Sequence, residues 1–384
     1  MMTKSANLFP KTMAFTLILM ASVTSYAQTL IGGIYYNLDD TKKEAEVTNK
    51  SSVSDRIHYS GNMNIPKTVK SGNVTYTVTS ISDEFFFQAN NLISLSIPST
   101  VKQIGVSTFP ACTNLKSITV DKDNKVFDSR NNCNAVIHTE TNELLFGCKN
   151  TVIPSTVTRI ADYAFFQVDM SSIVIPNTVT SIGSMAFFNC TNFVSVTLPE
   201  SLVSVEKMAF CGCMSLESVV IPNTVTYIED VAFASCHSLK SVTLSNNLEN
   251  IGEMAFTSCD ALETITIPAS VTEIGENAFE GCYSLRSITF LSTTPPKIGK
   301  GAFDEGASTE IHVPKGYKSV YENNPMFEHC NIIDDMPVPA TSGIEGFEGN
   351  SEIGVDKVYT ISGQRVAKPE KGLYIVNGKK YIVK

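Results

Sequence analysis

Hydrophobic and polar residues repeat along most of the chain with a period of 23 residues. Phenylalanine and cysteine mark the period most clearly, because each recurs five times without a change of spacing: Phe187, Phe210, Phe233, Phe256 and Phe279, and Cys190, Cys213, Cys236, Cys259 and Cys282. The phenylalanine column continues at spacings of 22 to 24 residues to Phe165 and Phe303, and Phe86 and Phe109 are again 23 residues apart. Such self-similarity predicts a repeat protein whose units stack on one another.

One unit, residues 216–236, shows the elements that each turn should contain. Residues 218–221 alternate polar and apolar side chains, which predicts a strand, and Pro222 ends it. Residues 225–228 predict a second, shorter extended piece, and residues 232–236 predict a short turn or helical turn. A unit of this size cannot form its own core, so we expect a solenoid. With about 5 Å between stacked strands, its nine phenylalanine-bearing turns predict a rod about 45 Å long.

The N-terminus has the pattern of a secretory signal peptide. Lys4 and Lys11 precede an apolar stretch at 13–23, and Ala27 supplies a small residue for cleavage. This stretch is too short for a transmembrane helix, and no later segment reaches 18 apolar residues. We therefore expect residues 1–27 to be removed and the chain to be exported to the cell surface or the extracellular medium.

The rest of the chain divides into four expected segments. These are an N-terminal β cap at 28–80, the solenoid with its C-terminal cap at 81–336, a linker rich in Gly, Pro, Ser and Glu at 337–354, and a small β module at 355–384. The spacing from Phe109 to Phe165 is 56 residues, so one turn carries an insertion. The alternation in this insertion predicts a β-hairpin near 121–150.

The repeat closely resembles the BspA-type leucine-rich repeat of bacterial surface proteins. The match lies in Ile-Pro at 175–176, Val-Thr-x-Ile at 179–182, Ala-Phe at 186–187 and Cys190, and it covers about residues 30–335. The resemblance implies a solenoid with a sheet on one face, on a secreted or surface protein of a Bacteroides-like bacterium, with a role in adhesion or protein binding. An open end of such a β-rich solenoid would expose its core, so we expect caps at both ends.

The C-terminal tail has a resemblance of its own. Its Tyr-x-x-Ser-Gly-Gln-Arg-Val segment and the Lys-Gly-Leu-Tyr-Ile-Val-Asn-Gly-Lys-Lys segment that follows resemble the sorting tails of proteins exported by the type IX secretion system. A small module for protein contact, with no sorting role, fits the same residues.

Composition and motifs exclude several functions. Hydrophobic residues make up 43% of the chain and charged residues 17%, which excludes disorder as its main state. Loss of Lys4 and Lys11 with the signal peptide changes the formal net charge from −9 to −11, and no basic run suits nucleic acid. The chain has no nucleophile elbow, P-loop, dinucleotide fingerprint or zinc-protease motif, and the acidic residues of its repeats are scattered rather than paired on one column. We expect no enzyme, no cofactor and no metal.

The cysteines also have a structural interpretation. The slot of the cysteine column holds Val168 and Ala89 in other turns, so an apolar occupant suffices and the thiols should be buried and free. Cys133 and Cys148 flank the expected hairpin and are the best candidates for a disulfide, with two free thiols as the alternative.

The outward positions of the first strand form the candidate ligand face. Alternation places two columns of hydroxyl residues on the solvent side, and the candidates are Ser195, Thr197, Ser218, Ser241, Thr243, Thr264, Thr266, Ser287 and Thr289. This uncharged surface suits an extracellular protein or a glycan, or less readily ice. Variable positions such as Arg159, Ser181, Tyr227 and Glu273 would then tune the partner of a monomeric protein. The alternative is that small hydroxyl residues simply suit an exposed sheet, in a structural envelope component without a ligand.

Overall fold

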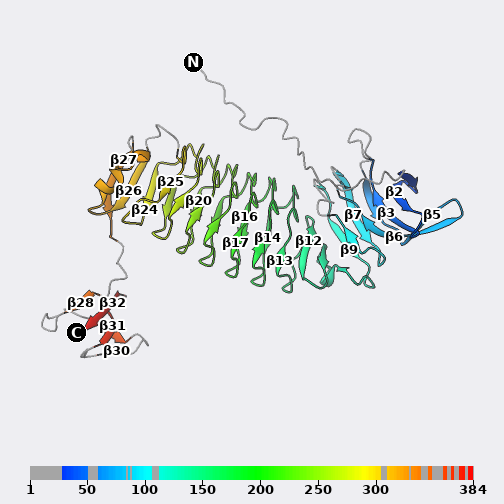
Figure 1. Cartoon of the computed structure of the whole chain (residues 1–384), viewed down its shortest axis with the longest axis horizontal. Helices are drawn as coiled ribbons and strands as arrows, with labels where there is room; N and C mark the ends of the chain where they lie inside the picture. The colour runs from blue at the N-terminus through cyan, green and yellow to red at the C-terminus, as the bar shows by residue number, and fades with distance from the viewer. Residues whose placement is uncertain are drawn as a thin grey trace, which may run out of the picture.

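The computed structural model describes residues 28–50, 59–83, 85–86, 89–105, 112–303, 309–327 and 330–338, and five short strands beyond residue 338. The signal peptide expected at 1–27 and most of the linker expected at 337–354 lie outside the described residues. The molecule is an elongated stack of turns that runs from an N-terminal group of strands to β26 (Glu310–Pro314) and β27 (Asn331–Met336) (Figure 1). It is a β-solenoid, as the 23-residue period predicts.

One side of the solenoid is a ten-stranded sheet in which most strands have two residues. From the third strand onward the neighbours are parallel, and each successive strand comes from the next turn. The strands in order are β10 (Phe127–Asp128), β11 (Ala135–His138), β12 (Glu143–Gly147), β13 (Arg159–Ile160), β15 (Ser181–Ile182), β17 (Ser204–Val205), β19 (Tyr227–Ile228), β21 (Asn250–Ile251), β23 (Glu273–Ile274) and β25 (Lys297–Ile298). These strands are the second extended piece that the repeat predicts.

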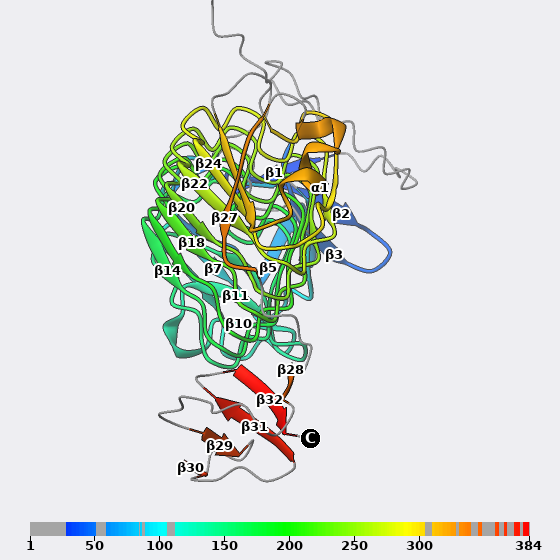
Figure 2. The same ribbon diagram turned by 90° about the vertical axis from the view of Figure 1, so that its left-hand side faces the viewer.

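A second side carries the strands at the start of each unit, which form three shorter parallel sheets. Figure 2 shows several of these strands following one another along one side of the molecule. The sheets are β4 (Ser60–Asn64), β7 (Asn91–Ile97) and β9 (Ser117–Val120); β14 (Ser172–Val174), β16 (Ser195–Thr197), β18 (Ser218–Val220) and β20 (Ser241–Thr243); and β22 (Thr264–Ile267), β24 (Ser287–Phe290), β26 and β27.

The third side consists of the Ala-Phe turns, which join consecutive turns of the solenoid without forming strands. Met185 and Asn189 have positive φ angles of 55° and 53°, which turn their N–H groups towards the next turn. The N–H groups of residues 185, 187 and 189 then donate to the carbonyl groups of residues 207, 209 and 211 at 2.8–3.0 Å. Within the described residues, helical structure is confined to α1 (Lys318–Glu322), η2 (Arg130–Asn132) and η3 (Pro325–Phe327).

The phenylalanine column forms a stack along the centre of the solenoid. The rings of Phe187 and Phe210 are 5.1 Å apart and within 3° of parallel, and the rings of Phe233 and Phe256 are 5.4 Å apart at the same angle. All four side chains are fully buried. The spacing of one ring per turn confirms that the 23-residue period is the period of the solenoid.

The cysteine column lies beside this stack, and its thiols are buried and free, as predicted. Each thiol also has a polar partner that the sequence did not reveal. The Sγ atoms of Cys213 and Cys236 donate to the carbonyl oxygens of Phe187 and Phe210 in the preceding turn, both at 3.3 Å. The same bond recurs in the next two turns at Cys259 and Cys282.

The hairpin of β11 and β12 divides the interior into two cores. Ala135, Ile137 and Leu144 pack into the core of the C-terminal turns, whereas Val136 and Phe146 pack into the N-terminal core. Alternation explains this along β11, because successive side chains of a strand point to opposite faces. On β12 the register shifts, so that Val136 is opposite Phe146 but Ile137 is opposite Leu144, and this irregularity lets Leu144 and Phe146 serve different cores.

Cys133 and Cys148, the candidate disulfide pair, take the second of the two expected forms. Both residues are buried free thiols. Cys133 belongs to the C-terminal core and Cys148 to the N-terminal core, so the hairpin lies between their environments. The Sγ atom of Cys148 instead donates to the carbonyl oxygen of Asn134 at 3.2 Å.

The N-terminal core is completed by a sheet that precedes the repeats. Its strands pair in the order β1 (Thr29–Ile31), β2 (Ile34–Asp39), β3 (Glu44–Thr48), β6 (Val74–Ile81) and β5 (Thr68–Ser71), and β8 (Gln103–Ile104) pairs with β6. Tyr36, Val47 and Val78 from this sheet are buried in the same cluster as Phe85 and Phe86 of the first turns.

The C-terminal module contains a separate five-stranded sheet. Its strands pair in the order β28 (Glu345–Phe347), β32 (Lys379–Val383), β31 (Gly372–Val376), β29 (Val358–Thr360) and β30 (Arg365–Val366). β31 and β32 are antiparallel with Val376 opposite Lys379, which is the register that the sequence Asn377-Gly378 favours in a two-residue hairpin turn.

Candidate functional site

The nine candidate ligand residues lie on five consecutive strands of the second side, from β16 to β24, and we call this surface the hydroxyl face. Equivalent residues are opposite one another across the strands: Ser218 is paired with Ser241, and Thr266 with Thr289. The residue between the two columns points inward, as Val219 does, and is buried except in β16, where Val196 is half-buried. Seven of the nine side chains are exposed, and Ser287 and Thr289 are half-buried.

The hydroxyl groups of this face are not used by the fold. Within the described part of the chain, no hydrogen bond joins any of these nine hydroxyl groups to another protein group. Hydrogen-bonding capacity that the protein does not use is available to solvent or to a ligand. The surface therefore presents regularly spaced donors and acceptors on rigid strands.

A further column of hydroxyl residues lies outside the hydroxyl face, in the loops that follow the strands of the second side. Unlike the residues of the face, those of this column form hydrogen bonds within the protein. The hydroxyl groups of Thr178, Ser201 and Ser270 each donate to a carbonyl oxygen of the preceding turn at 2.7 Å. These carbonyl groups belong to the loops that follow the first strand, where the chain needs side-chain partners. Hydroxyl residues in that column hold turns together, whereas those on the hydroxyl face do not.

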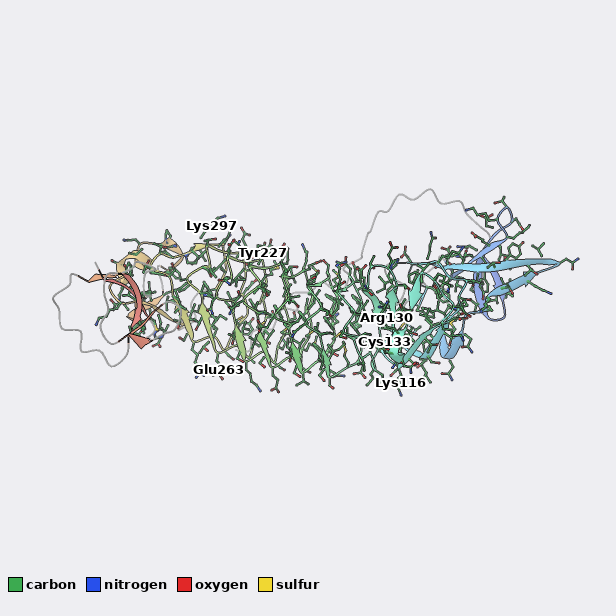
Figure 3. All side chains as sticks on the ribbon, turned by 90° about the horizontal axis from the view of Figure 1, so that it is seen from below. Lys116, Arg130, Cys133, Tyr227, Glu263 and Lys297 are labelled. Carbon is green, nitrogen blue, oxygen red and sulfur yellow. The ribbon has the colours of Figure 1, made fainter. Side chains whose placement is uncertain are left out.

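Ionisable residues along one rim of the hydroxyl face pair with one another across adjacent turns. Lys240 is 3.7 Å from Glu217, Arg286 pairs with Glu263, and His237 Nδ1 is 2.9 Å from Asp260. Figure 3 shows Glu263, a member of this rim, along one long edge of the molecule. The Lys240–Glu217 and Arg286–Glu263 pairs each combine one positive and one negative side chain, so neither adds net charge to the face.

The hydroxyl face ends in a charged group that sequence analysis missed. Glu310 and His312 of β26 continue the two columns, opposite Ser287 and Thr289. His312 Nδ1 is 2.9 Å from a carboxylate oxygen of Asp335, and its Nε2 is 3.6 Å from Glu310. The 23-residue spacing from Ser287 to Glu310 and from Thr289 to His312 was the signal that could have found them.

The structure does not bring the variable positions to the hydroxyl face. Arg159, Ser181, Tyr227 and Glu273 belong to the ten-stranded sheet on the other side of the repeat. Tyr227 and Lys297 of that sheet lie along the long edge opposite Glu263 (Figure 3). A corner of each turn therefore separates these positions from the hydroxyl face, and their role in tuning a partner stays a prediction.

The buried thiols give no reactive group. Burial raises the pKa of Cys190 and of Cys211 to about 12, so both remain protonated at neutral pH. In the regions that the structure describes, no three His, Cys, Asp or Glu side chains converge in a way that would hold a metal ion. No helix among the described residues is long and apolar enough to cross a membrane. The chemistry of the hydroxyl face is hydrogen bonding.

The model of the BspA type leucine rich repeat region matches residues 64–144, 143–217 and 203–334. A leucine-rich repeat protein from Bacteroides ovatus of known crystal structure is 27% identical, with 74% of this chain and 70% of that chain covered and a TM-score of 0.54. A leucine rich cell surface protein from Faecalibacterium prausnitzii is 22% identical over 74% of this chain and 97% of that chain, with a TM-score of 0.35.

A comparison with curated proteins gives no significant match. The family model nevertheless covers most of the solenoid, from strand β4 to β27. Together with the 23-residue turns and the stacked phenylalanine column, this match shows that the chain belongs to the BspA-type leucine-rich-repeat family.

Proposed function

We propose that this protein is exported to the bacterial surface, where it binds an extracellular protein through the hydroxyl face, without catalysing a reaction. The observation that carries the proposal is the row of nine hydroxyl side chains with no partner in the described part of the fold. The family to which the chain belongs consists of repeat scaffolds, and the signal-peptide pattern at residues 1–27 supports export.

Binding would rest on many weak contacts rather than on one deep pocket. Parallel strands hold each hydroxyl group in place, so a partner meets a surface that needs no ordering when it binds. The nine side chains of the face are uncharged, which suits a partner surface that is polar but uncharged. A glycan would make the same type of hydrogen bond, and the experiment below separates the two ligand classes.

The test is a binding screen of the purified full chain against an array of extracellular matrix proteins and glycans. A variant with Thr243, Thr266 and Thr289 changed to Lys removes the hydroxyl groups and adds charge to the face. The matched control changes Thr180, Thr226 and Thr272 to Lys, because these exposed threonines lie in or beside the ten-stranded sheet.

The proposal expects a specific protein that binds the wild-type chain and the control variant but not the hydroxyl-face variant. A ligand lost equally in both variants would place the site elsewhere. A glycan as the specific ligand would replace the protein partner of the proposal. The absence of any ligand for folded protein would favour a structural role in the envelope.

A further inference from the structure

The parallel strands of the second side are interrupted where the inserted turn passes between β9 and β14. Residues 149–155, which follow the inserted hairpin, lie at this position, and they form no strand. Backbone and side-chain bonds hold this segment to the hairpin instead: the Val152 N–H donates to the carbonyl oxygen of Cys133 at 3.0 Å, and the Thr151 hydroxyl donates to that of Asn134 at 2.8 Å. Within the described residues, β14 is consequently the edge strand of its sheet.

The interruption leaves an open depression between the inserted turn and β14. Its volume is about 430 Å³, and it is lined by eight uncharged residues from 151–155 and 172–176. Binding pockets for ligands span roughly 300–1,000 Å³, so the depression has room for a few side chains. A second depression, at the ends of β4, β7 and β9, differs because the ion pair of Lys67 and Asp121 lies at its edge, with 2.9 Å between Nζ and the carboxylate.

Two strongly exposed valines flank the depression. Val152 is 71% exposed and Val174 is 80% exposed, and they occupy equivalent positions in consecutive turns. Threonine takes this position in most other turns, so the apolar side chains are concentrated where the sheet is interrupted. Burying two valine side chains would stabilise a complex through the hydrophobic effect.

The charges around the depression are already neutralised within the protein. Lys149 pairs with Asp169 at 2.6 Å, and Arg130 pairs with Asp128 at 2.6 Å while it donates to the hydroxyl group of Thr156 at 3.2 Å. A charged partner segment would therefore lose its hydration without gaining an opposite charge. The complementary partner is uncharged.

From these observations we infer that β14 binds an uncharged, extended segment of a partner protein. The segment adds a parallel strand on the side of the depression and covers Val152 and Val174. An edge strand offers backbone hydrogen-bonding groups to such a segment, and the side chains beside it select the sequence. The inference rests on the proposed function, since it specifies where and how a protein partner is bound.

The test uses a synthetic peptide with the sequence of residues 170–176, acetylated and amidated at its ends and labelled with fluorescein. In the protein, this sequence contains β14, which pairs in parallel with β16. The peptide therefore has the alternation of inward and outward side chains that a strand of this sheet requires. Fluorescence anisotropy measures its binding to the purified full chain. A second peptide carries Glu in place of the residue that corresponds to Val174.

The informative variant is Val174→Lys, and the matched control is Val220→Lys. Val220 is 60% exposed and occupies the same column, but β18 is paired on both sides. The inference expects saturable binding that weakens about ten- to hundredfold in Val174→Lys, stays unchanged in Val220→Lys, and is lost with the Glu peptide. Both variants change exposed residues, and equal melting temperatures would verify their folding.

Three results would overturn the inference. The first is that the peptide does not bind at millimolar protein. The second is that Val174→Lys and Val220→Lys weaken peptide binding equally. The third is a dimer of the wild-type chain that Val174→Lys dissociates, because a second copy of the chain would then be the occupant. The array screen is independent of the peptide. If the screen finds a ligand of the hydroxyl face and the peptide does not bind, the proposed function stands and this inference fails.

Discussion

The Sγ atom of Cys213 donates a hydrogen bond across 3.3 Å to the carbonyl oxygen of Phe187, and this bond connects two consecutive turns of the solenoid. The carbonyl oxygen of Phe187 also accepts the N–H of Cys190 within its own turn. The thiol therefore does more than fill an apolar slot. Cysteine combines a small buried volume with a weak donor, a combination that valine and alanine in this slot lack.

Changing Cys236 to Ala or to Val should separate packing from hydrogen bonding. Ala removes both the sulfur volume and the bond to Phe210, so we expect a loss of about 1–2 kcal/mol in the free energy of unfolding. Val restores volume but not the donor and should recover only part of this loss. Urea unfolding followed by circular dichroism measures both. A Val variant as stable as the wild type would show that the bond contributes nothing.

Stability should decrease in alkaline solution because of the buried thiols. Burial raises the pKa of Cys112, Cys190 and Cys211 to about 12 from an ordinary value of 9.0. Above pH 9 these thiols lose protons in the unfolded chain but keep them in the folded chain, so rising pH favours unfolding. Their contribution is complete below pH 9 and is lost progressively towards pH 12.

Melting temperatures of the wild type and of Cys190→Ala at pH 7, 9 and 10.5 would check this dependence. The variant has one buried thiol fewer, so its melting temperature should fall less steeply with pH. Parallel curves for the two proteins would contradict the assignment to Cys190.

Two serine-to-alanine changes should distinguish the two hydroxyl columns. Ser270 Oγ is 2.7 Å from the carbonyl oxygen of Leu248 and 2.9 Å from that of Asn246, so Ser270→Ala should cost about 1 kcal/mol. Ser241 is exposed on the hydroxyl face, and Ser241→Ala should change stability by less than about 0.5 kcal/mol. Chemical denaturation of both variants measures the difference, and equal effects would remove the distinction between the columns.

Loss of one ring from the phenylalanine stack should destabilise the turns around it. Phe233 is fully buried between the rings of Phe210 and Phe256, at 5.3 and 5.4 Å, and Phe233→Ala should cost about 3–5 kcal/mol. Hydrogen exchange should then increase most in residues 210–256, because each turn contacts mainly its neighbours.

The control for this change is Phe188→Ala. Phe188 stacks on Phe166 at 5.1 Å but is only half-buried, so its loss should cost clearly less. If hydrogen exchange in Phe233→Ala rose evenly along the whole chain, the turns would unfold as one unit, contrary to the expectation.

The sequence predicted the stack and its register because both depend on spacing alone. Phe233 stacks on Phe256, and Ser218 pairs with Ser241; the residues of each pair are one 23-residue repeat apart. Both contacts follow from the spacing, because turns of equal length superimpose when they stack. It did not predict the backbone of the third side. Met185 and Val231 have positive φ angles although neither is glycine or asparagine, and bonds to the next turn offset the cost of this conformation.

The candidate face was only partly predictable for a similar reason. Ser241 and Ser270 look alike in the sequence, but only Ser270 lies next to carbonyl groups of the preceding turn. Whether a hydroxyl group is free depends on the path of another turn, which is a property of the stack. The chain turns a corner between Ser218 and Tyr227, so the two residues belong to different sheets. The position of this corner likewise depends on how the turns close around the core.

The β11–β12 hairpin, which separates the two cores, has a consequence for how such a protein can change its length. Phe187 and Phe279 lie in the C-terminal core, and the N-terminal core receives no side chain from the turns between them. Duplication or deletion of one 23-residue unit in this region would shift the end of the rod by one ring spacing, about 5 Å, and leave the N-terminal core unaltered. The length of the solenoid is thus a quantity that gene recombination can adjust in whole steps, without redesign of the domain at the other end.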